Sequence, residues 1–353
     1  MRRLPTLSIL PALTVAFWAA AASAGSETAS PTGDARPAPT QEAVVLCALL
    51  PHGKDAYWWA VSWGLDDEAA KRGVRIGIYE AGGYKNQNVQ LRQWAECRRR
   101  GADAYIVAAT KATGLETPLR LAAAEGQPVI DLINGIDSRL ITSHAMVSFH
   151  EMARLAAEHV VADSSGRPIS IAWMPGPAGA GWVTDGDRAV REVVAAHPRI
   201  RLMHVGFGPT DTTSQASLLR THLREHPMPD YILGNAVAIE VAARMIEQQQ
   251  PPRPPRLVAY YAIASIVTLI REGKVLAAPT DSPVLQARIA VDLALRAVRG
   301  ETVPERASPA IEVLTRETLP GFDLRRLLPP DGQWMIRREL PEPREPEVNR
   351  AQR

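Results

Sequence analysis

The sequence has little cysteine, few aromatic residues and almost no excess of one charge. Cys47 and Cys97 are its only cysteines among 353 residues, which excludes a framework of several disulfides. Two cysteines without a nearby histidine cluster do not form a zinc site. The 40 Lys and Arg residues nearly balance the 38 Asp and Glu residues, and the net charge of +2 gives no reason to expect nucleic acid or an acidic surface as a partner.

The short motifs of common catalytic sites are also missing. The sequence contains no Gly-x-Ser-x-Gly elbow, no Gly-x-x-x-x-Gly-Lys-Ser/Thr loop and no His-Glu-x-x-His pair. The glycine-rich stretch 175–181 lacks the Lys of a phosphate loop, so it either approaches a ligand closely or simply lets the chain bend. We therefore expect a binding protein, not an enzyme, with no catalytic residue, metal or cofactor.

Only the first residues form a long apolar run. A positive start, Met1-Arg2-Arg3, precedes the mostly apolar residues 4–22 and an Ala-Ser-Ala end. This pattern predicts a secretory signal peptide cleaved after Ala24. A retained membrane anchor is the alternative, but two prolines in the run and the small-residue end favour the signal peptide. No later stretch approaches 18 uninterrupted apolar residues, so we expect an exported protein whose mature chain does not enter the membrane.

From residue 43 onward, short apolar runs alternate with stretches of helical length. Several helical stretches end in basic residues followed by glycine, as helix termini favour. Strands that alternate with helices of this length form βαβ units and a parallel sheet. The predicted strands are 44–50, 74–79, 104–108, 129–133, 169–174, 201–206, 231–233, 257–261, 275–280 and 311–314, and the predicted helices are 58–72, 88–100, 114–125, 151–161, 185–196, 213–225, 236–248, 264–272 and 281–300.

This pattern occurs twice, which predicts an α/β fold of two similar doubly wound parallel-sheet lobes joined by a multi-strand hinge. Clefts between two such lobes are a common place for small ligands. The composition of the remaining parts predicts a flexible lead-in and a disordered charged tail. The predicted parts are the signal peptide 1–24, the lead-in 25–42, the N-terminal lobe 43–146 (completed by part of 262–300), the C-terminal lobe 147–280, a crossover helix with C-terminal extension 281–338, and the tail 339–353.

The two cysteines fall in neighbouring parts of the first lobe. Cys47 lies in the first predicted strand, and Cys97 lies in a helix expected to cover the same sheet. An oxidising compartment permits them to pair. The sequence leaves both a disulfide and two buried thiols open.

The stretch 46–59 is the most informative part of the chain. A buried strand ends at Pro51, and a helix begins after the loop 51–55. In open parallel sheets, ligands bind at the carboxyl ends of strands. The helix starts with Tyr57, Trp58 and Trp59, and three consecutive rings cannot all face one core. We expect at least one ring to face a cavity above the strand end; purely structural packing is the alternative.

Other aromatic residues also fall in loops at strand ends, although aromatic residues make up only 5% of the chain. This distribution predicts an aromatic cage, in which ring faces hold a methylated cation and a few polar groups orient it. Asp55 either adds a fixed negative charge near the cation or only caps the helix that follows it. The strand-end candidates are Asp55, Tyr57, Trp58, Tyr84, Phe149, Trp182, Tyr261 and Asp281.

A set of short motifs is spread over residues 43–335. The motifs are Leu46-Cys47-Ala48, Pro51-His52-x-Lys54-Asp55-x-Tyr57-Trp58, Glu80-Ala81-Gly82-Gly83-Tyr84-x-Asn86, Cys97 with Gly101-Ala102-Asp103-Ala104, Pro175-Gly176-Pro177, and Lys274-Val275-Leu276-Ala277-Ala278-Pro279-Thr280-Asp281-Ser282. This set resembles the TorT family, periplasmic sensors of trimethylamine N-oxide within the ribose-binding kind of type I periplasmic binding proteins.

The resemblance implies a non-enzymatic periplasmic sensor. Ligand-loaded protein would dock on the periplasmic domain of a TorS-like membrane sensor histidine kinase and set its signalling state. Carried over by matching position, the residues that would line the ligand site are Asp55, Tyr57, Trp58, Tyr84 and Tyr261. The alternative is a solute-binding component of an ABC transporter for a sugar or an amine.

The chain departs from the family at the first crossover between lobes. The family has Asp-Trp-Tyr there, whereas this chain has Ser148-Phe149-His150. Phe149 still offers a ring face, but the ring is smaller and has no indole N–H. A related small amine oxide or methylated amine therefore stays open beside trimethylamine N-oxide. The pair Tyr260-Tyr261 also leaves open which ring faces the cleft.

Overall fold

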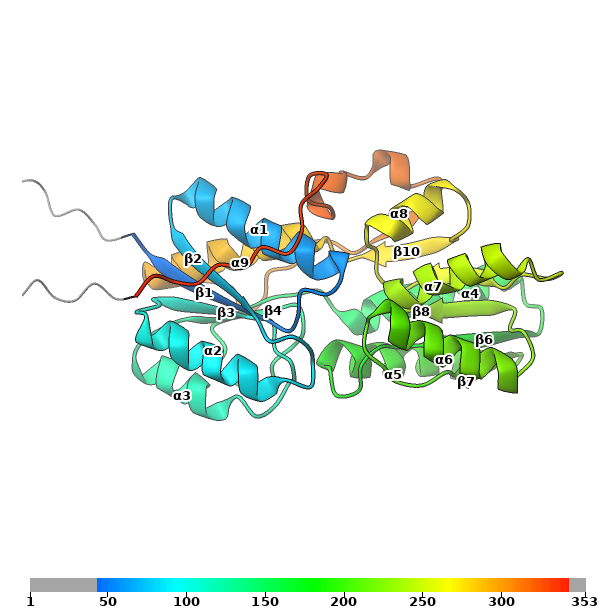
Figure 1. Ribbon diagram of the computed structural model, residues 1–353, viewed down its shortest axis with the longest axis horizontal. Coiled ribbons are helices and arrows are strands. Elements are labelled where there is room, and N and C mark those ends of the chain that lie inside the picture. Colours follow the sequence, from blue (N-terminus) through cyan, green and yellow to red (C-terminus); the bar gives the residue numbers. More distant parts are fainter. Residues whose placement is uncertain (1–42, 343–353) are drawn as a thin grey trace, which may run out of the picture. The chain divides into compact units, whose positions relative to one another are not determined.

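The computed structural model describes residues 43–342 (Figure 1). The expected signal peptide, its cleavage site after Ala24, the lead-in 25–42 and most of the expected tail lie outside the described residues. Among residues 43–342, no helix is long and apolar enough to span a membrane.

The N-terminal lobe is built on a five-stranded parallel sheet in the order β2-β1-β3-β4-β5. Helices α1 and α9 (Pro283–Val298) cover one face and α2 and α3 the other (Figure 1), so β1 is buried on both sides and reads as a continuous apolar run. Its elements are β1 (Val45–Leu50), α1 (Ala56–Arg72), β2 (Arg75–Glu80), α2 (Gln87–Arg99), β3 (Ala104–Val107), α3 (Glu116–Ala124), β4 (Val129–Leu132) and β5 (Ser143–Ala145).

The C-terminal lobe has a six-stranded sheet in the order β11-β10-β9-β8-β6-β7, parallel except for the antiparallel edge strand β11. The predicted α/β class with two doubly wound lobes is therefore confirmed. Its elements are α4 (Phe149–Ser164), β6 (Ile169–Met174), α5 (Gly181–Ala195), β7 (Ile200–His204), α6 (Thr212–Glu225), β8 (Tyr231–Gly234), α7 (Ala236–Gln249), β9 (Arg256–Ala259), α8 (Ala264–Arg271), β10 (Ala277–Thr280) and β11 (Glu312–Thr315), followed by the short 3-10 helices Leu319–Gly321 and Leu324–Arg326.

The chain passes between the two sheets several times. Residues 146–148 lead from β5 to α4, and residues 281–282 lead from β10 to α9 (Pro283–Val298). Helix α9 packs against α1 and the strands of the N-terminal sheet, and the chain then returns to form β11 in the other sheet. The short strand β5 was not predicted, because three residues are too few to give a periodic pattern.

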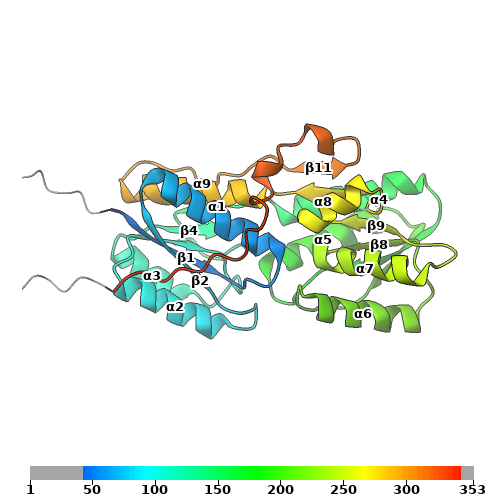
Figure 2. The ribbon, with the colours of Figure 1, turned by 45° about the horizontal axis from the view of Figure 1, so that its top comes forward.

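The first residues of the expected disordered tail are ordered, so that prediction is wrong for them. Arg338 and Ile78 exchange two backbone hydrogen bonds of 2.8 and 3.0 Å, which pairs the C-terminal segment with the free edge of β2 (Figure 2). Leu340 is 1% exposed and packs over Gly77, where any Cβ would lie 2.7 Å from the Leu340 Cγ. Charge and proline predicted disorder, but one buried leucine and an unpaired sheet edge outweigh them.

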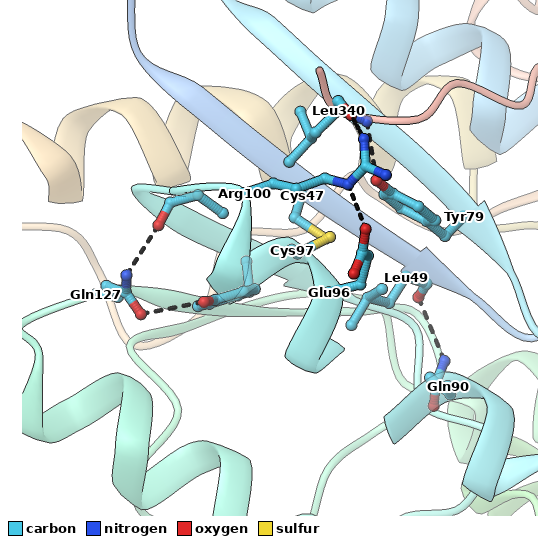
Figure 3. The surroundings of a disulfide bond; sticks show 11 residues. Cys47, Leu49, Tyr79, Gln90, Glu96, Cys97, Arg100, Gln127 and Leu340 are labelled. Carbon is cyan, nitrogen blue, oxygen red and sulfur yellow. Dashed lines mark hydrogen bonds and ion pairs between the residues drawn. A yellow bond between two sulfur atoms is a disulfide. The ribbon is translucent and has the colours of Figure 1, made fainter. Parts of the chain in front are cut away.

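Cys47 of β1 and Cys97 of α2 form a disulfide (Figure 3). The bridge joins residues 50 positions apart, and closing a loop of that length in the unfolded chain stabilises the fold by about 4 kcal/mol. At the end of α2, the Arg100 guanidinium donates to the Leu340 carbonyl and also pairs with Glu96. The disulfide and the C-terminal segment thus constrain the same lobe, and both cysteines and Leu340 pack in one hydrophobic cluster.

Candidate ligand-binding site

The loop between β1 and α1 places Asp55 at the boundary of the two lobes. Asp55 caps α1, because its Oδ1 accepts the Trp58 backbone N–H at 3.2 Å. Its Oδ2 accepts the hydroxyl of Thr210, which precedes α6 of the other lobe, at 3.2 Å. Burial raises the pKa of Asp55, and the nearby His52 opposes that rise. Asp55 therefore serves both as a helix cap and as a buried carboxyl group facing the other lobe.

The six residues predicted to bind the ligand, namely the five carried over from the family and Phe149, surround a single cavity. The centre of a water-sized sphere can move through about 20 Å³ inside this cavity. A space of this size has room for one small molecule at most. Six of its ten lining residues are aromatic. The lining residues are Asp55, Tyr57, Trp58, Tyr84, Ile133, Asn134, Phe149, Trp182, Thr210 and Tyr261. The structure brings all six predicted residues together; that they contact a ligand stays a prediction.

The rings meet mostly edge to face. Tyr57 lies 5.4 Å from both Trp58 and Tyr261, with interplanar angles of 76° and 72°. Trp182 meets Tyr261 at 5.9 Å and 87°. Aromatic pairs prefer this geometry because a positive ring edge faces a negative ring face. The aromatic rings that line the cavity therefore hold one another in position through these contacts.

The structure decides which residue of the Tyr260-Tyr261 pair faces the cavity. Tyr260 is fully buried, stacks on Trp182 at 5.8 Å and 30°, and donates its hydroxyl to the Pro175 carbonyl at 2.7 Å. Tyr261 lines the cavity. Tyr260 thus supports the wall from behind, and Tyr261 forms part of it.

Two further contacts join the lobes at the cavity wall. The indole Nε1 of Trp182 donates to the Tyr84 hydroxyl at 3.1 Å. Gly181 at the start of α5 approaches Asn134 so closely that a Cβ on Gly181 would lie 2.6 Å from the Asn134 carbonyl oxygen. A glycine at this position permits the two lobes to meet.

Tyr57 connects the cavity to the crossover segments. Its hydroxyl donates to Asp281 Oδ2, which also accepts the Gln286 amide at 2.5 Å. The Gln286 Oε1 in turn accepts the Val147 backbone N–H at 3.0 Å. Burial raises the pKa of Asp281 to about 6, and the hydrogen bonds from Tyr57 and Gln286 oppose that rise. A change at the Tyr57 ring therefore reaches both crossover segments through hydrogen bonds.

A larger, more polar cleft adjoins the cavity. It offers about 480 Å³ and shares Tyr84 and Thr210 with the small cavity. Its other lining groups include Lys54, Lys85 and Asp211, and also Phe207, which is 48% exposed. His52 lies between the two spaces, with its ring 5.9 Å from Trp58 and 5.3 Å from Tyr84, and burial lowers its pKa.

Three lining residues were not among the sequence candidates. Ile133 and Asn134 follow β4, and the Asn134-Gly135 pair is a turn signal at a strand end that could have marked them. Thr210 has no such signal, because it reaches the cavity only through the packing of the loop before α6. Among residues 43–342, no group of three or more His, Cys, Asp or Glu side chains could hold a metal ion.

Two α/β lobes with a small cavity between them define a two-lobed binding protein. The family model described as "Periplasmic binding protein domain" matches residues 47–302. The periplasmic protein TorT of Escherichia coli K12 is 31% identical over 296 residues, which cover 84% of this chain and 85% of that protein. The chain belongs to the TorT family of periplasmic binding proteins.

Similar proteins with solved structures include a component of a sensor complex and a component of a transporter. TorT in complex with the TorS sensor domain, in the presence of trimethylamine N-oxide, is 30% identical with a TM-score of 0.73 and covers 83% of this chain and 99% of that chain. An ABC transporter solute-binding protein from Bradyrhizobium sp. BTAi1, with bound bis-tris, is 33% identical with a TM-score of 0.72 and covers 84% of this chain and 89% of that chain.

Proposed function

We propose that this protein is an exported periplasmic sensor that binds trimethylamine N-oxide, or a related small methylated amine, in the cavity between its lobes. The ligand-loaded protein then regulates a membrane sensor histidine kinase through the kinase's periplasmic domain. The observation that carries the proposal is the cavity itself, with six aromatic rings from both lobes around about 20 Å³ and one buried carboxyl group, Asp55.

The chemistry of the ligand suits these groups. The nitrogen of the N-oxide carries a positive charge spread over three methyl groups, which aromatic ring faces attract. The Tyr84 hydroxyl accepts from Trp182 and keeps its own proton, which it can donate to the oxide oxygen. Asp55 lines the same cavity, where a carboxylate favours the cationic part of a ligand.

The size of the ligand sets the affinity to expect. A molecule with five non-hydrogen atoms gains at most about 1.5 kcal/mol per atom, so its dissociation constant cannot be much tighter than about 3 μM. A sugar needs a ring of hydrogen-bonding groups around it, whereas six of the ten lining residues here are aromatic.

The related transporter component from Bradyrhizobium supports a second candidate function, a solute-binding component of an ABC transporter. Calorimetry of the purified mature chain in an amine-free buffer separates the two. We expect heat of binding with trimethylamine N-oxide and none with ribose, and a changed heat when the sensor domain of the candidate kinase is present. Binding of ribose without binding of the N-oxide would favour the transporter.

A matched pair of variants tests the cage. Phe149→Leu removes a ring at the cavity, and Phe322→Leu removes a buried ring elsewhere in the core. We expect Phe149→Leu to weaken N-oxide binding about tenfold, since a cation–ring contact in a water-poor site contributes on the order of 1–2 kcal/mol. Phe322→Leu should leave the affinity unchanged. Equal affinities in both variants would count against the cage.

A further inference from the structure

Asn134 adds a hydrogen-bond acceptor, its Oδ1, to the cavity wall. A cage made of aromatic rings alone does not require such an acceptor. The residue is 2% exposed and follows β4. Its amide nitrogen donates to the Ala109 carbonyl at 2.7 Å, and since a carbonyl oxygen can only accept, this bond fixes which end of the amide is which. The other end, Oδ1, is buried and has no hydrogen-bond partner within residues 43–342.

The backbone holds Asn134 in place at a cost. The preceding residue, Ile133, has φ of +68°, a left-handed conformation that is sterically unfavourable for a β-branched side chain. The Asn134 N–H closes a tight turn onto the Leu132 carbonyl at 2.7 Å. Strained backbone is concentrated at binding sites, where surrounding structure maintains it. Here the strained residue and the unpartnered acceptor are neighbours and both line the cavity.

The surroundings of Asn134 point to a ligand that donates. Asn134 lines the same cavity as Tyr84, and its Oδ1 is buried without a hydrogen-bond partner among residues 43–342. Asp55, a second acceptor group, lines the same space. Trimethylamine N-oxide has an acceptor oxygen and no N–H, whereas a protonated di- or trimethylamine carries both a positive charge and an N–H donor.

Resting on the proposed function, we propose that Asn134 Oδ1 accepts a hydrogen bond from the N–H of a methylated ammonium ligand. Asn134 is then the residue by which this cavity selects trimethylammonium over tetramethylammonium. A water molecule can take the donor position when the ligand is absent.

The test is a set of titrations with trimethylammonium, tetramethylammonium and trimethylamine N-oxide. We expect the wild-type protein to bind trimethylammonium at least about tenfold more tightly than tetramethylammonium, because a hydrogen bond from a charged donor is worth about one order of magnitude in affinity. The fourth methyl group also makes tetramethylammonium larger, so variants must separate size from hydrogen bonding.

Asn134→Leu and Asn134→Asp form the matched pair, because both remove the amide that bonds Ala109 and only the second keeps an acceptor oxygen. We expect Asn134→Leu to reduce the preference for trimethylammonium over tetramethylammonium to less than about threefold. Asn134→Asp should keep the preference. Thermal unfolding shows whether each variant folds, and Asn134→Ala replaces the leucine variant if that one does not.

The outcomes separate this proposal from the function on which it rests. Binding of the methylated compounds with the same preference in wild type and Asn134→Leu overturns the role of Asn134 and leaves the cage standing. Equal loss of all three ligands in both variants shows that Asn134 only supports the fold. No binding of any of the three compounds to the wild-type protein rejects the cage and this proposal together.

Discussion

The two lobes contribute unlike groups to the same cavity. Each lobe supplies three of the six rings, but the N-terminal lobe adds the carboxyl group of Asp55 and the amide of Asn134, whereas the C-terminal lobe adds the hydroxyl of Thr210. The N-terminal lobe also carries the disulfide and the paired C-terminal segment. The carboxyl and amide groups of the cavity thus lie on the lobe that carries these extra constraints.

Removing the disulfide should change the stability of the N-terminal lobe, relative to the C-terminal lobe, more than any other change proposed below. We expect Cys47→Ala with Cys97→Ala to lower the free energy of unfolding by about 4 kcal/mol, because the unfolded chain regains the freedom of a long loop. The loss should fall on the N-terminal lobe. Hydrogen exchange should therefore speed up in β1 and α2 and change little in β6 and β8. Equal loss of protection in both lobes would mean that they unfold as one unit.

Neutralising Asp281 tests the connection between the lobes. Burial raises its pKa from 3.8 to about 6, so the folded protein binds this proton more tightly than the unfolded chain. The resulting stability is fully present below about pH 4 and is lost as the pH rises through 6, by about 3 kcal/mol.

In Asp281→Asn this part of the pH dependence should disappear. Urea unfolding of the variant and the wild type at pH 4, 5, 6 and 7 measures the difference. Parallel pH profiles for the two proteins would show that Asp281 does not titrate in this way.

Shortening Leu340 tests the hold of the C-terminal segment on β2. Leu340 is 1% exposed, so Leu340→Ala should lower the free energy of unfolding by at least about 2 kcal/mol. Arg337→Ala is the matched control, because the side chain of Arg337 is 58% exposed and its pair with Glu80 contributes less than about 1 kcal/mol. A Leu340→Ala protein as stable as the control would show that the segment does not pack in solution.

The smallest expected effect comes from a substitution at Gly181, where the two lobes approach each other closely. Gly181→Ala places a methyl group against the Asn134 carbonyl, and we expect ligand affinity to fall about tenfold, or about 1.4 kcal/mol, with little change in stability. Gly186→Ala on the same helix is the control, because its Cβ would meet Tyr260 of its own lobe at 3.4 Å. Equal affinities in the two variants would mean that ligand binding does not need this close approach.

Much of the fold and of the site was predictable because the signals are local. Strands such as Ile169–Met174 agree with the prediction, and most other elements differ from it by one to a few residues at an end. The six site residues converge because the carboxyl ends of parallel strands share one edge of a sheet. Thr210 was missed because a lone polar residue in a loop carries no periodic signal, whereas the turn signal Asn134-Gly135 at a strand end could have marked Asn134.

The sequence by itself determined the two α/β lobes, the family and the aromatic character of the site, because apolar periodicity and strand-end residues depend on near neighbours in the chain. Only the tertiary structure decided that Cys47 and Cys97 pair, that Tyr261 rather than Tyr260 faces the cavity, and that Leu340 is buried. Each of these features depends on contacts between segments that are far apart in the sequence. Such contacts form only when the strands and helices of the lobes are assembled.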